Sequence, residues 1–197
     1  AVLQVLEEVD EVTNDIETLL NKNKIWLDRT KGIGIISKDD AFSYGISGPL
    51  ARAAGIEWDL REKEPYSSYE DFDFDVVIAL NGDVFDRYLV RMEEIRQSVK
   101  ICREALEKMP PGEVNVDPGL GFSLPPKDEV YNSIEGLIYH FEVTMPNRGM
   151  TPPIGEAYVP TESPNGELGF YIVSDGTRTP YRVRTRPPSF INYSIFS

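Results

Sequence analysis

The sequence of 197 residues contains very few of the side chains that usually bind metals or act as nucleophiles. It has one cysteine, Cys102, and one histidine, His140, so an internal disulfide is excluded and this chain alone cannot assemble a zinc or iron–sulfur site. It has no Walker A or G-x-G-x-x-G glycine pattern and no G-x-S-x-G sequence, so nucleotide binding and Ser/His/Asp hydrolysis receive no support. We therefore predict that the chain has no catalytic residues of its own and binds no metal.

Positive charge is also scarce, with 20 lysines and arginines against 33 aspartates and glutamates and a net charge of −13. Nucleic-acid binding, which needs a cationic face, is therefore disfavoured, and so is direct adsorption to an anionic membrane. The longest aliphatic run, Val76–Leu80, is far shorter than the roughly 20 apolar residues of a membrane-spanning helix. No signal-peptide pattern opens the chain. With an ordinary globular composition, these features indicate a soluble protein of a reducing compartment.

Three stretches have the apolar spacing of helices. Residues 2–20 carry an apolar stripe opposite an acidic face, which we expect to be solvated. Asp83 is placed to cap a helix over residues 84–109, whose apolar seam includes Cys102 and predicts that this thiol is buried. A third helix is expected over residues 126–141, with its apolar side chains facing inward and His140 in a structural position.

Residues 43–61 are unusual because glycines and a proline interrupt two short helices. Ser37 is expected to cap the first helix, and Ser47 is expected to cap the second. The segment that follows, up to residue 75, is acidic and aromatic, and we expect it to be extended with its rings packed on the body of the protein. The irregular stretch ends in three chemically distinct side chains: Trp58, Asp59 and Arg61.

Residues after 155 change to the period-two pattern of strands. The pattern predicts a loop over residues 114–126 and three strands at about 156–163, 167–176 and 180–186. No acidic residue follows Asp175, and arginines at every second position of the last strand project from one face. They indicate contact with an anionic partner or, as an alternative, an edge strand kept soluble by charge. These residues are Arg182, Arg184 and Arg186.

The predicted fold class is mainly α with a small antiparallel β portion, that is, α+β. We expect residues 1–145 to form a helical bundle core with an irregular segment at 43–75, and residues 146–197 to form a small β-hairpin or sheet region. The chain begins inside an apolar stripe and ends without a terminating pattern. We therefore expect both parts to belong to one contiguous fragment of a larger domain.

Five stretches resemble a known family, the 49 kDa subunit (also called the D subunit) of respiratory complex I, NADH–quinone oxidoreductase. In chain order they are "RTKGIGIIS", "YGISGPLARAAGIEWDLR", "GDVFDRYLVRMEEIRQS", "KMPPGEVNV" and "SPNGELGFYIVSDGTRTPYRVRTRPPSF". They extend over most of the chain, and the second and third are long and unusual. The last stretch also resembles a hairpin of nickel–iron hydrogenase large subunits, which implies a hydrogenase-large-subunit-like helical bundle.

The resemblance implies a role in electron transfer within a larger assembly. The family's subunit packs against a neighbour that holds the terminal [4Fe-4S] cluster, and the two form the cavity where quinone is reduced, coupled to proton translocation. The implied partners are other complex I subunits and quinone, with no nucleic acid and membrane contact only through the complex. The implied location is peripheral, on the cytoplasmic face of the bacterial inner membrane or the matrix side of the mitochondrial one.

The sequence departs from the family's pattern at both ends. The N-terminal sheet with the histidine and tyrosine that meet the quinone headgroup is missing, and so is the C-terminal segment that completes the cavity. We therefore carry over no catalytic residue, and the isolated chain is expected to be inactive. A hydrogenase-like scaffold that acts as an interaction module without redox chemistry is the alternative function.

Within the resemblance, we expect residues 47–61 to lie beside the cluster-bearing subunit and the cavity wall. Arg52 could reach a partner's carboxylate, or Asp59 and Arg61 could simply pair with each other to hold the turn. The candidate residues of this stretch are Ser47, Gly48, Arg52, Trp58, Asp59 and Arg61.

Overall fold

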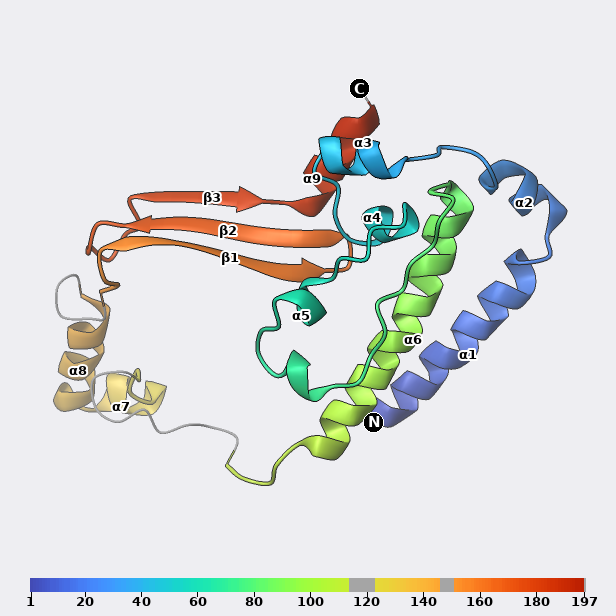
Figure 1. The fold of residues 1–197 in the computed structure, drawn as a ribbon. Helices are drawn as coiled ribbons and strands as arrows, with labels where there is room; N and C mark the ends of the chain where they lie inside the picture. The colour runs from blue at the N-terminus through green and yellow to red at the C-terminus, as the bar shows by residue number, and fades with distance from the viewer. Residues whose placement is uncertain (114–122, 146–150, 197) are drawn as a thin grey trace. The chain divides into compact units, whose positions relative to one another are not determined.

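The computed structural model describes residues 1–113, 123–145 and 151–196 (Figure 1). These residues confirm a mainly helical chain with a small antiparallel sheet. Contacts group the chain into two compact units, of which the first comprises residues 1–109, 160–169 and 185–197 and the second residues 110–159 and 170–184. Because these units do not follow the order of the chain, our division at residue 145 stays a prediction. Most of the predicted loop at 114–126 lies outside the described residues.

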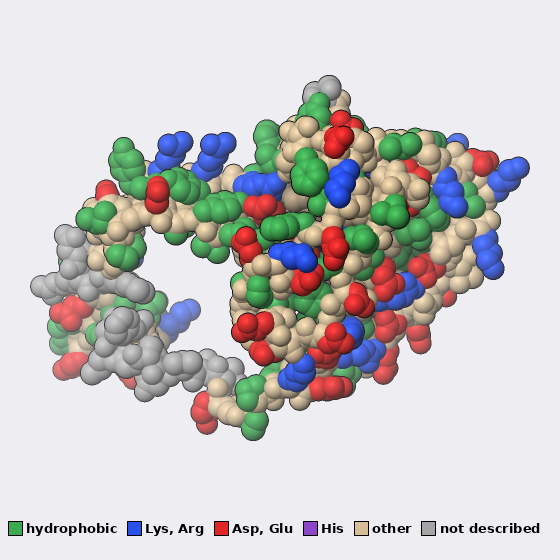
Figure 2. All heavy atoms as spheres, viewed as in Figure 1, with side chains coloured by type: hydrophobic (Ala, Val, Ile, Leu, Met, Phe, Trp, Pro, Cys, Tyr) green, Lys and Arg blue, Asp and Glu red, His purple; other side chains and the backbone are tan. Residues whose placement is uncertain are grey.

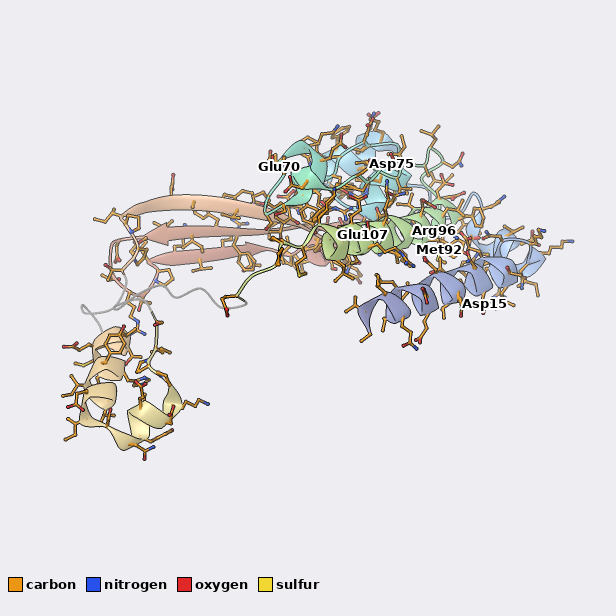
Figure 3. The ribbon with its side chains drawn as sticks, turned by 90° about the horizontal axis from the view of Figure 1, so that it is seen from below. Asp15, Glu70, Asp75, Met92, Arg96 and Glu107 are labelled. Carbon is orange, nitrogen blue, oxygen red and sulfur yellow. The ribbon has the colours of Figure 1, made fainter. Side chains whose placement is uncertain are left out.

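The first unit is built on two long helices, α1 (Val2–Leu20) and α6 (Val84–Lys108). The predicted cap of α6 is confirmed, because the Asp83 side chain accepts a hydrogen bond from the amide of Asp86 at 2.8 Å. The two helices pack against each other, and Figure 3 shows Met92 and Arg96 on the side of α6 that faces α1. Their direction is antiparallel, since Glu17 near the end of α1 pairs with Arg96, whereas Asp10 in the middle of α1 pairs with Arg103 further along α6.

The acidic face of α1 is only partly solvated, so that expectation was partly wrong. Arg96 of α6 forms an ion pair with Glu17, and Arg103 forms one with Asp10 at 3.2 Å. The predicted burial of Cys102 was also wrong, because its side chain is exposed. The physical reason is that α1 covers only part of the apolar seam of α6, and Cys102 lies on the uncovered part.

Four short helices and a 3₁₀ turn connect the long ones. They are α2 (Lys24–Thr30), α3 (Lys38–Ser43), α4 (Pro49–Ala53), α5 (Leu60–Lys63) and η1 (Tyr69–Asp71). Ser37 caps α3 as predicted, with its hydroxyl accepting from the amide of Asp40. Ser47 does not cap α4, which begins after Gly48 without a side-chain cap, because the Ser47 hydroxyl is bonded elsewhere. Alanines and isoleucines form the core here: Ile36, Ala41, Ile46, Ala51 and Ala54.

The aromatic segment after α5 packs as predicted. The rings of Tyr66 and Tyr69 meet edge to face at 5.0 Å, and Tyr69 meets Phe74 in the same way at 6.3 Å. The Arg61 guanidinium lies over the Phe74 ring at 5.1 Å. This ring cluster therefore fixes the position of the chain directly after residues 47–61.

The three predicted strands are confirmed as β1 (Gly155–Ser163), β2 (Gly166–Ser174) and β3 (Arg182–Arg186). The sheet order is β1-β2-β3, so β1 and β3 are its edges. After β3 the chain forms α9 (Pro188–Tyr193) and η2 (Ser194–Phe196).

The helix predicted over residues 126–141 is in fact two helices of the second unit, α7 (Lys127–Asn132) and α8 (Ile134–Thr144). The chain breaks at Ser133, which is extended at φ −132° and ψ 146° and caps α8 through the amide of Gly136. The expected inward-facing side chains are exposed in the described residues, with Ile134 at 72% and Phe141 at 52%. His140 lies in the last turns of α8. None of the described helices combines the length and the apolar character needed to cross a bilayer.

Candidate functional site

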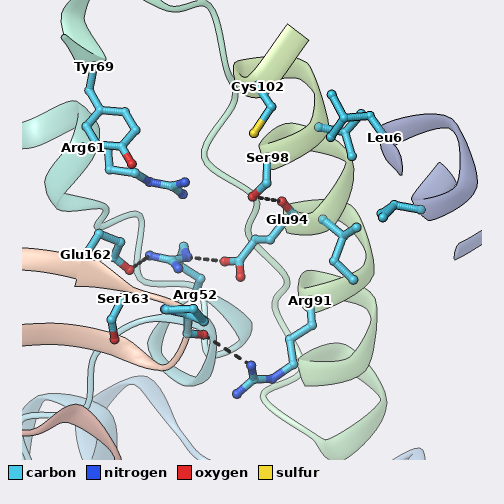
Figure 4. Close-up of a pocket in the computed structure, with 14 residues that line it drawn as sticks. Leu6, Arg52, Arg61, Tyr69, Arg91, Glu94, Ser98, Cys102, Glu162 and Ser163 are labelled. Carbon is cyan, nitrogen blue, oxygen red and sulfur yellow. Dashed lines mark hydrogen bonds and ion pairs between the residues drawn. The ribbon is translucent and has the colours of Figure 1, made fainter. Parts of the chain in front are cut away.

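The first unit contains a buried ion network centred on Arg52 of α4, whose side chain is 2% exposed (Figure 4). Its Nε donates to Glu94 of α6 at 2.7 Å. Its Nη1 donates to Glu162 of β1 at 2.9 Å and to the backbone carbonyl of Trp58 at 2.9 Å. Arg52 therefore ties together α4, α6 and the tip of the β1–β2 hairpin.

A second arginine completes the network from α5. The Arg61 side chain binds Asp59 in a bidentate pair, with Nε donating at 3.0 Å and Nη2 at 2.7 Å. Asp59 also caps α5 by accepting from the amide of Arg61, and it lies 3.5 Å from Nη1 of Arg52. Two guanidinium groups thus share three carboxylates, those of Asp59, Glu94 and Glu162.

Burial and neighbouring charges shift the pKa values of several side chains in this network. Burial opposes the charge on Arg52, but Glu94, Glu162 and Asp59 raise its pKa above the ordinary value, so it is a permanent cation. Burial first, and then the negative charge of Asp59, raise the pKa of Glu162 even though Arg52 works in the opposite direction. The protein environment therefore disfavours the charged form of Glu162.

A pocket of about 640 Å³ in the first unit has this network in one wall. Figure 4 shows the network beside α6, where Glu94 and Ser98 project from the helix towards it. The apolar part of the lining comes from α1 and α6, and its members are Leu6, Val9, Ile95 and Val99. Cys102 lies on the same side of α6 as Glu94 and Ser98. The pocket thus joins an apolar face to a wall of fixed charge.

Ser47 and Gly48 lie at a second junction, where the loop before α4 meets the turn between β1 and β2. The Ser47 hydroxyl accepts from the amide of Glu167 at 3.1 Å, and Asn192 of α9 donates to the carbonyl of Asn165 at 3.0 Å. Gly48 has φ +69°, and a Cβ there would stand 2.4 Å from the Cα of Gly166. Only glycine permits this close approach of two backbones.

Of the three arginines of β3, the structure separates one from the other two. Arg186 donates to the backbone carbonyls of Glu167 at 2.7 Å and Gly45 at 2.8 Å, and it belongs to the Ser47 junction. Arg182 and Arg184 are exposed, and no hydrogen bond or ion pair joins their side chains to the rest of the described chain.

Comparison with known proteins identifies the family. The family described as "Respiratory-chain NADH dehydrogenase, 49 Kd subunit" matches residues 1–197. The chain belongs to this 49 kDa subunit family.

Relatives named as the D subunit of NADH-quinone oxidoreductase match nearly the whole chain. The protein from Geotalea uraniireducens (strain Rf4) is 52% identical over 193 residues, which are 98% of this chain and 48% of the relative. That from Methylacidiphilum infernorum (isolate V4) is 52% identical over 192 residues, 98% of this chain and 44% of the relative. That from Wolbachia sp. subsp. Brugia malayi (strain TRS) is 47% identical over 189 residues, 96% of this chain and 48% of the relative. The chain therefore spans about half the length of the curated relatives it matches.

The described residues of this chain do not provide the ligands of an iron–sulfur cluster. Cys102 is the one cysteine of the sequence, and it lines the pocket without a second thiol. Across residues 1–113, 123–145 and 151–196, no three His, Cys, Asp or Glu side chains are placed to hold a metal ion. We derive no step through a cluster in this chain.

Most of the predicted site residues lie either in the ion network around Arg52 or in the junction at Ser47. Arg52, Asp59 and Arg61 meet in the ion network, while Ser47 and Gly48 meet the hairpin turn. Trp58 contributes its carbonyl to Arg52, and its side chain stays 42% exposed. Arg52 binds carboxylates of its own chain, and its contact with a partner's carboxylate stays a prediction.

Sequence reasoning missed Glu94 and Glu162. A weak signal exists for Glu94, which lies one helical turn after the buried Val90 and so on the same face of α6. No periodic signal marks Glu162, because it is part of the polar end of β1 and lies 110 positions from Arg52. Asn192 was missed for the same reason, since its partners lie far away in the sequence.

Asp59→Asn is expected to lower the free energy of unfolding at neutral pH by about 1.5–3 kcal/mol, the usual value of hydrogen bonds to a charged group. Burial alone would raise the pKa of Asp59, but Arg61 and Arg52 outweigh it and lower the pKa below the ordinary 3.8. A carboxyl group with a lowered pKa stabilises the fold above its unfolded pKa, and this contribution disappears as the pH falls through the folded pKa. Asparagine can keep the cap of α5 through its carbonyl oxygen, but its NH2 group cannot accept from Arg61, so the variant removes the charge together with one hydrogen bond.

Urea unfolding of both proteins at a series of pH values measures this effect. The difference between them should be constant near neutrality and shrink below about pH 4. A difference that stays the same throughout the acid range would contradict the proposed electrostatic role of Asp59.

Proposed function

We propose that this chain is part of a subunit of NADH–quinone oxidoreductase, complex I, and helps to form the cavity where quinone is reduced. The observation that carries the proposal is identity of about half of all positions to relatives named as the D subunit of NADH-quinone oxidoreductase, over 98% of the chain. The electrons come from a [4Fe-4S] cluster in a neighbouring subunit, and quinone reduction is coupled to proton translocation. The chain itself supplies shape and fixed charge.

In this proposal, residues 47–61 lie beside the cluster-bearing neighbour and form part of the cavity wall. Two features support the placement. The backbone of residues 47–61 is irregular but held in place, and its charged side chains form ion pairs within the chain. The pairing of Asp59 with Arg61 also holds the turn, and this is compatible with a wall position. Trp58 presents the exposed side chain that is available for contact.

The remaining contacts follow from the same role. The partners are other complex I subunits and quinone at a shared site, and this chain holds no cofactor. Of the β3 arginines Arg182, Arg184 and Arg186, the first two are candidates for contact with an anionic partner, because Arg186 is bound within the chain. The subunit is peripheral, on the cytoplasmic face of the bacterial inner membrane or the matrix side of the mitochondrial one, and it meets the membrane only through the complex.

A chimeric protein tests the proposal. Residues 1–197 replace the matching half of the Geotalea uraniireducens relative in a bacterium that lacks its own copy. We expect membranes of this strain to regain NADH-dependent quinone reduction, because the family's missing segments are then present. A second chimera that lacks residues 1–197 is the matched control and should have no activity.

Two further measurements on the chimera distinguish the possible outcomes. A native gel shows whether the chimera enters the complex, and an artificial electron acceptor shows whether NADH oxidation is intact. An assembled complex that oxidises NADH but leaves quinone unreduced would reject the proposed role and favour a scaffold that only mediates interactions.

A further inference from the structure

The strand β3 forms an open edge of the sheet. Its neighbour on one side is β2, and the sheet order places no described strand on its other side. The amide of Tyr181, directly before β3, donates to the carbonyl of Val173 in β2 at 2.9 Å. Because backbone groups of an antiparallel edge strand alternate in direction, those of Val183 also face β2. The amide and carbonyl groups of Arg182 and Arg184 therefore face away from the sheet.

The same two residues carry positive charge without a counter-charge. Neither guanidinium forms an ion pair with the described residues, and no acidic residue follows Asp175 in the sequence. Both cations lie on one face of a single strand in a chain with a net charge of −13. Figure 2 shows basic side chains projecting from the sheet among apolar ones. Arg186 differs, because the Ser47 junction already binds it.

The residues that alternate with these arginines are apolar and exposed. Tyr181 is 76% exposed and Val183 is 51% exposed. Alternation along a strand puts them on the face opposite to Arg182 and Arg184. Within the described residues, the edge strand thus combines outward-facing backbone groups, positive charge on one face and an apolar surface on the other face.

We propose that the edge of β3 at residues 181–184 binds an extended acidic segment of a protein partner by strand addition. The backbone of that segment pairs with Arg182 and Arg184. Its acidic side chains occupy alternate positions beside the two guanidinium groups, and its apolar side chains contact Tyr181 and Val183. An anionic lipid headgroup would satisfy the charge but not the directed amide and carbonyl groups, so a peptide chain is the better match. This inference does not depend on quinone chemistry.

A binding measurement tests the proposal on the purified protein that contains this chain. The probe is a short synthetic peptide of alternating glutamate and valine, and its control is a peptide of the same composition with the glutamates in one block. The alternating peptide should bind in a salt-sensitive manner and more tightly than the control. The double variant R182E/R184E should bind it at least about tenfold more weakly, because two attractive pairs become repulsive.

A matched pair of variants separates strand addition from simple charge attraction. Arg184→Ala and Arg184→Pro both remove the guanidinium, but only proline removes the outward-facing amide, and proline is tolerated at such edge positions. The proline variant should bind about fivefold more weakly than the alanine variant, which corresponds to one lost hydrogen bond. Urea unfolding midpoints confirm that the variants stay folded.

Three results would overturn the proposal. The first is equal binding of the alternating and blocked peptides, which would leave only a charged edge that keeps the strand soluble. The second is equal affinity of the alanine and proline variants. The third is arginine-dependent capture by phosphatidylglycerol vesicles without peptide binding, which would make this edge a lipid contact.

Discussion

Arg52→Met is expected to lower the free energy of unfolding by about 3–5 kcal/mol, the cost typical of removing one partner from a buried ion pair. Methionine replaces the apolar stem of arginine and carries no guanidinium, so the variant leaves Glu94 and Glu162 buried without their hydrogen-bond donor. Urea unfolding of the purified protein measures the loss. In the assembled complex, we expect a lower quinone-reductase rate, of which part reflects this loss of stability.

Two further variants separate charge from geometry at this position. Arg52→Lys keeps one positive charge, but a single ammonium group cannot reproduce the planar fork that reaches Glu94 and Glu162 from different nitrogens, so an intermediate loss is expected. The double variant R52M/E162Q removes one of the stranded charges. It should therefore be more stable than R52M alone. If R52M unfolds at the same urea concentration as the parent protein, the network does not stabilise the fold.

Gly48→Ala is expected to lower the free energy of unfolding by about 4 kcal/mol. Roughly 1–3 kcal/mol arises from the backbone, since φ +69° and ψ −148° is a region that almost only glycine occupies. Another 1–3 kcal/mol or so arises from overpacking, because the new Cβ would stand 2.4 Å from the Cα of Gly166. That contact is with backbone, which cannot move aside as a flexible side chain would.

Gly32→Ala is the matched control for this prediction. Gly32 has a similar φ of +67°, but a Cβ there meets nothing within 4 Å. Its expected cost is about 1–2 kcal/mol, from backbone conformation alone. The difference between the two variants reports the collision with the hairpin turn together with the cost of the unusual ψ of −148° at Gly48. Equal losses for both would mean that Gly48 matters only for its dihedral angles.

The elements that could be predicted from the sequence are those whose signals are local. The long helix α6 has a cap at Asp83, a continuous apolar seam and a proline stop, and the strands of the hairpin have period-two alternation and glycine turns. The break between α7 and α8 was missed because the apolar spacing continues across Ser133 as it would in a single helix. Only the role of Ser133 as the N-cap of α8 reveals the boundary. The burial of Cys102 was wrong because periodicity identifies an apolar face but not what covers it.

About half of the charged side chains in the candidate site could be predicted from the sequence. Arg52, Asp59 and Arg61 were identified because irregular backbone and charged side chains coincide in one short stretch. Their acidic partners Glu94 and Glu162 come from a helix face and a strand end, where a single glutamate gives at most a weak signal. Which charges meet is decided by tertiary packing, and no local pattern records it.

The pairing of Arg52 with Glu162 bridges 110 positions of the chain and has a consequence for biosynthesis. At translation speeds of about 5–20 residues per second, the α4 guanidinium emerges from the ribosome several seconds before its hairpin carboxylate. During that interval, Arg52 in the nascent helical part lacks one of its carboxylate partners. We infer that completion of the hairpin, rather than collapse of the helices, is the late event that commits this polypeptide to its native state.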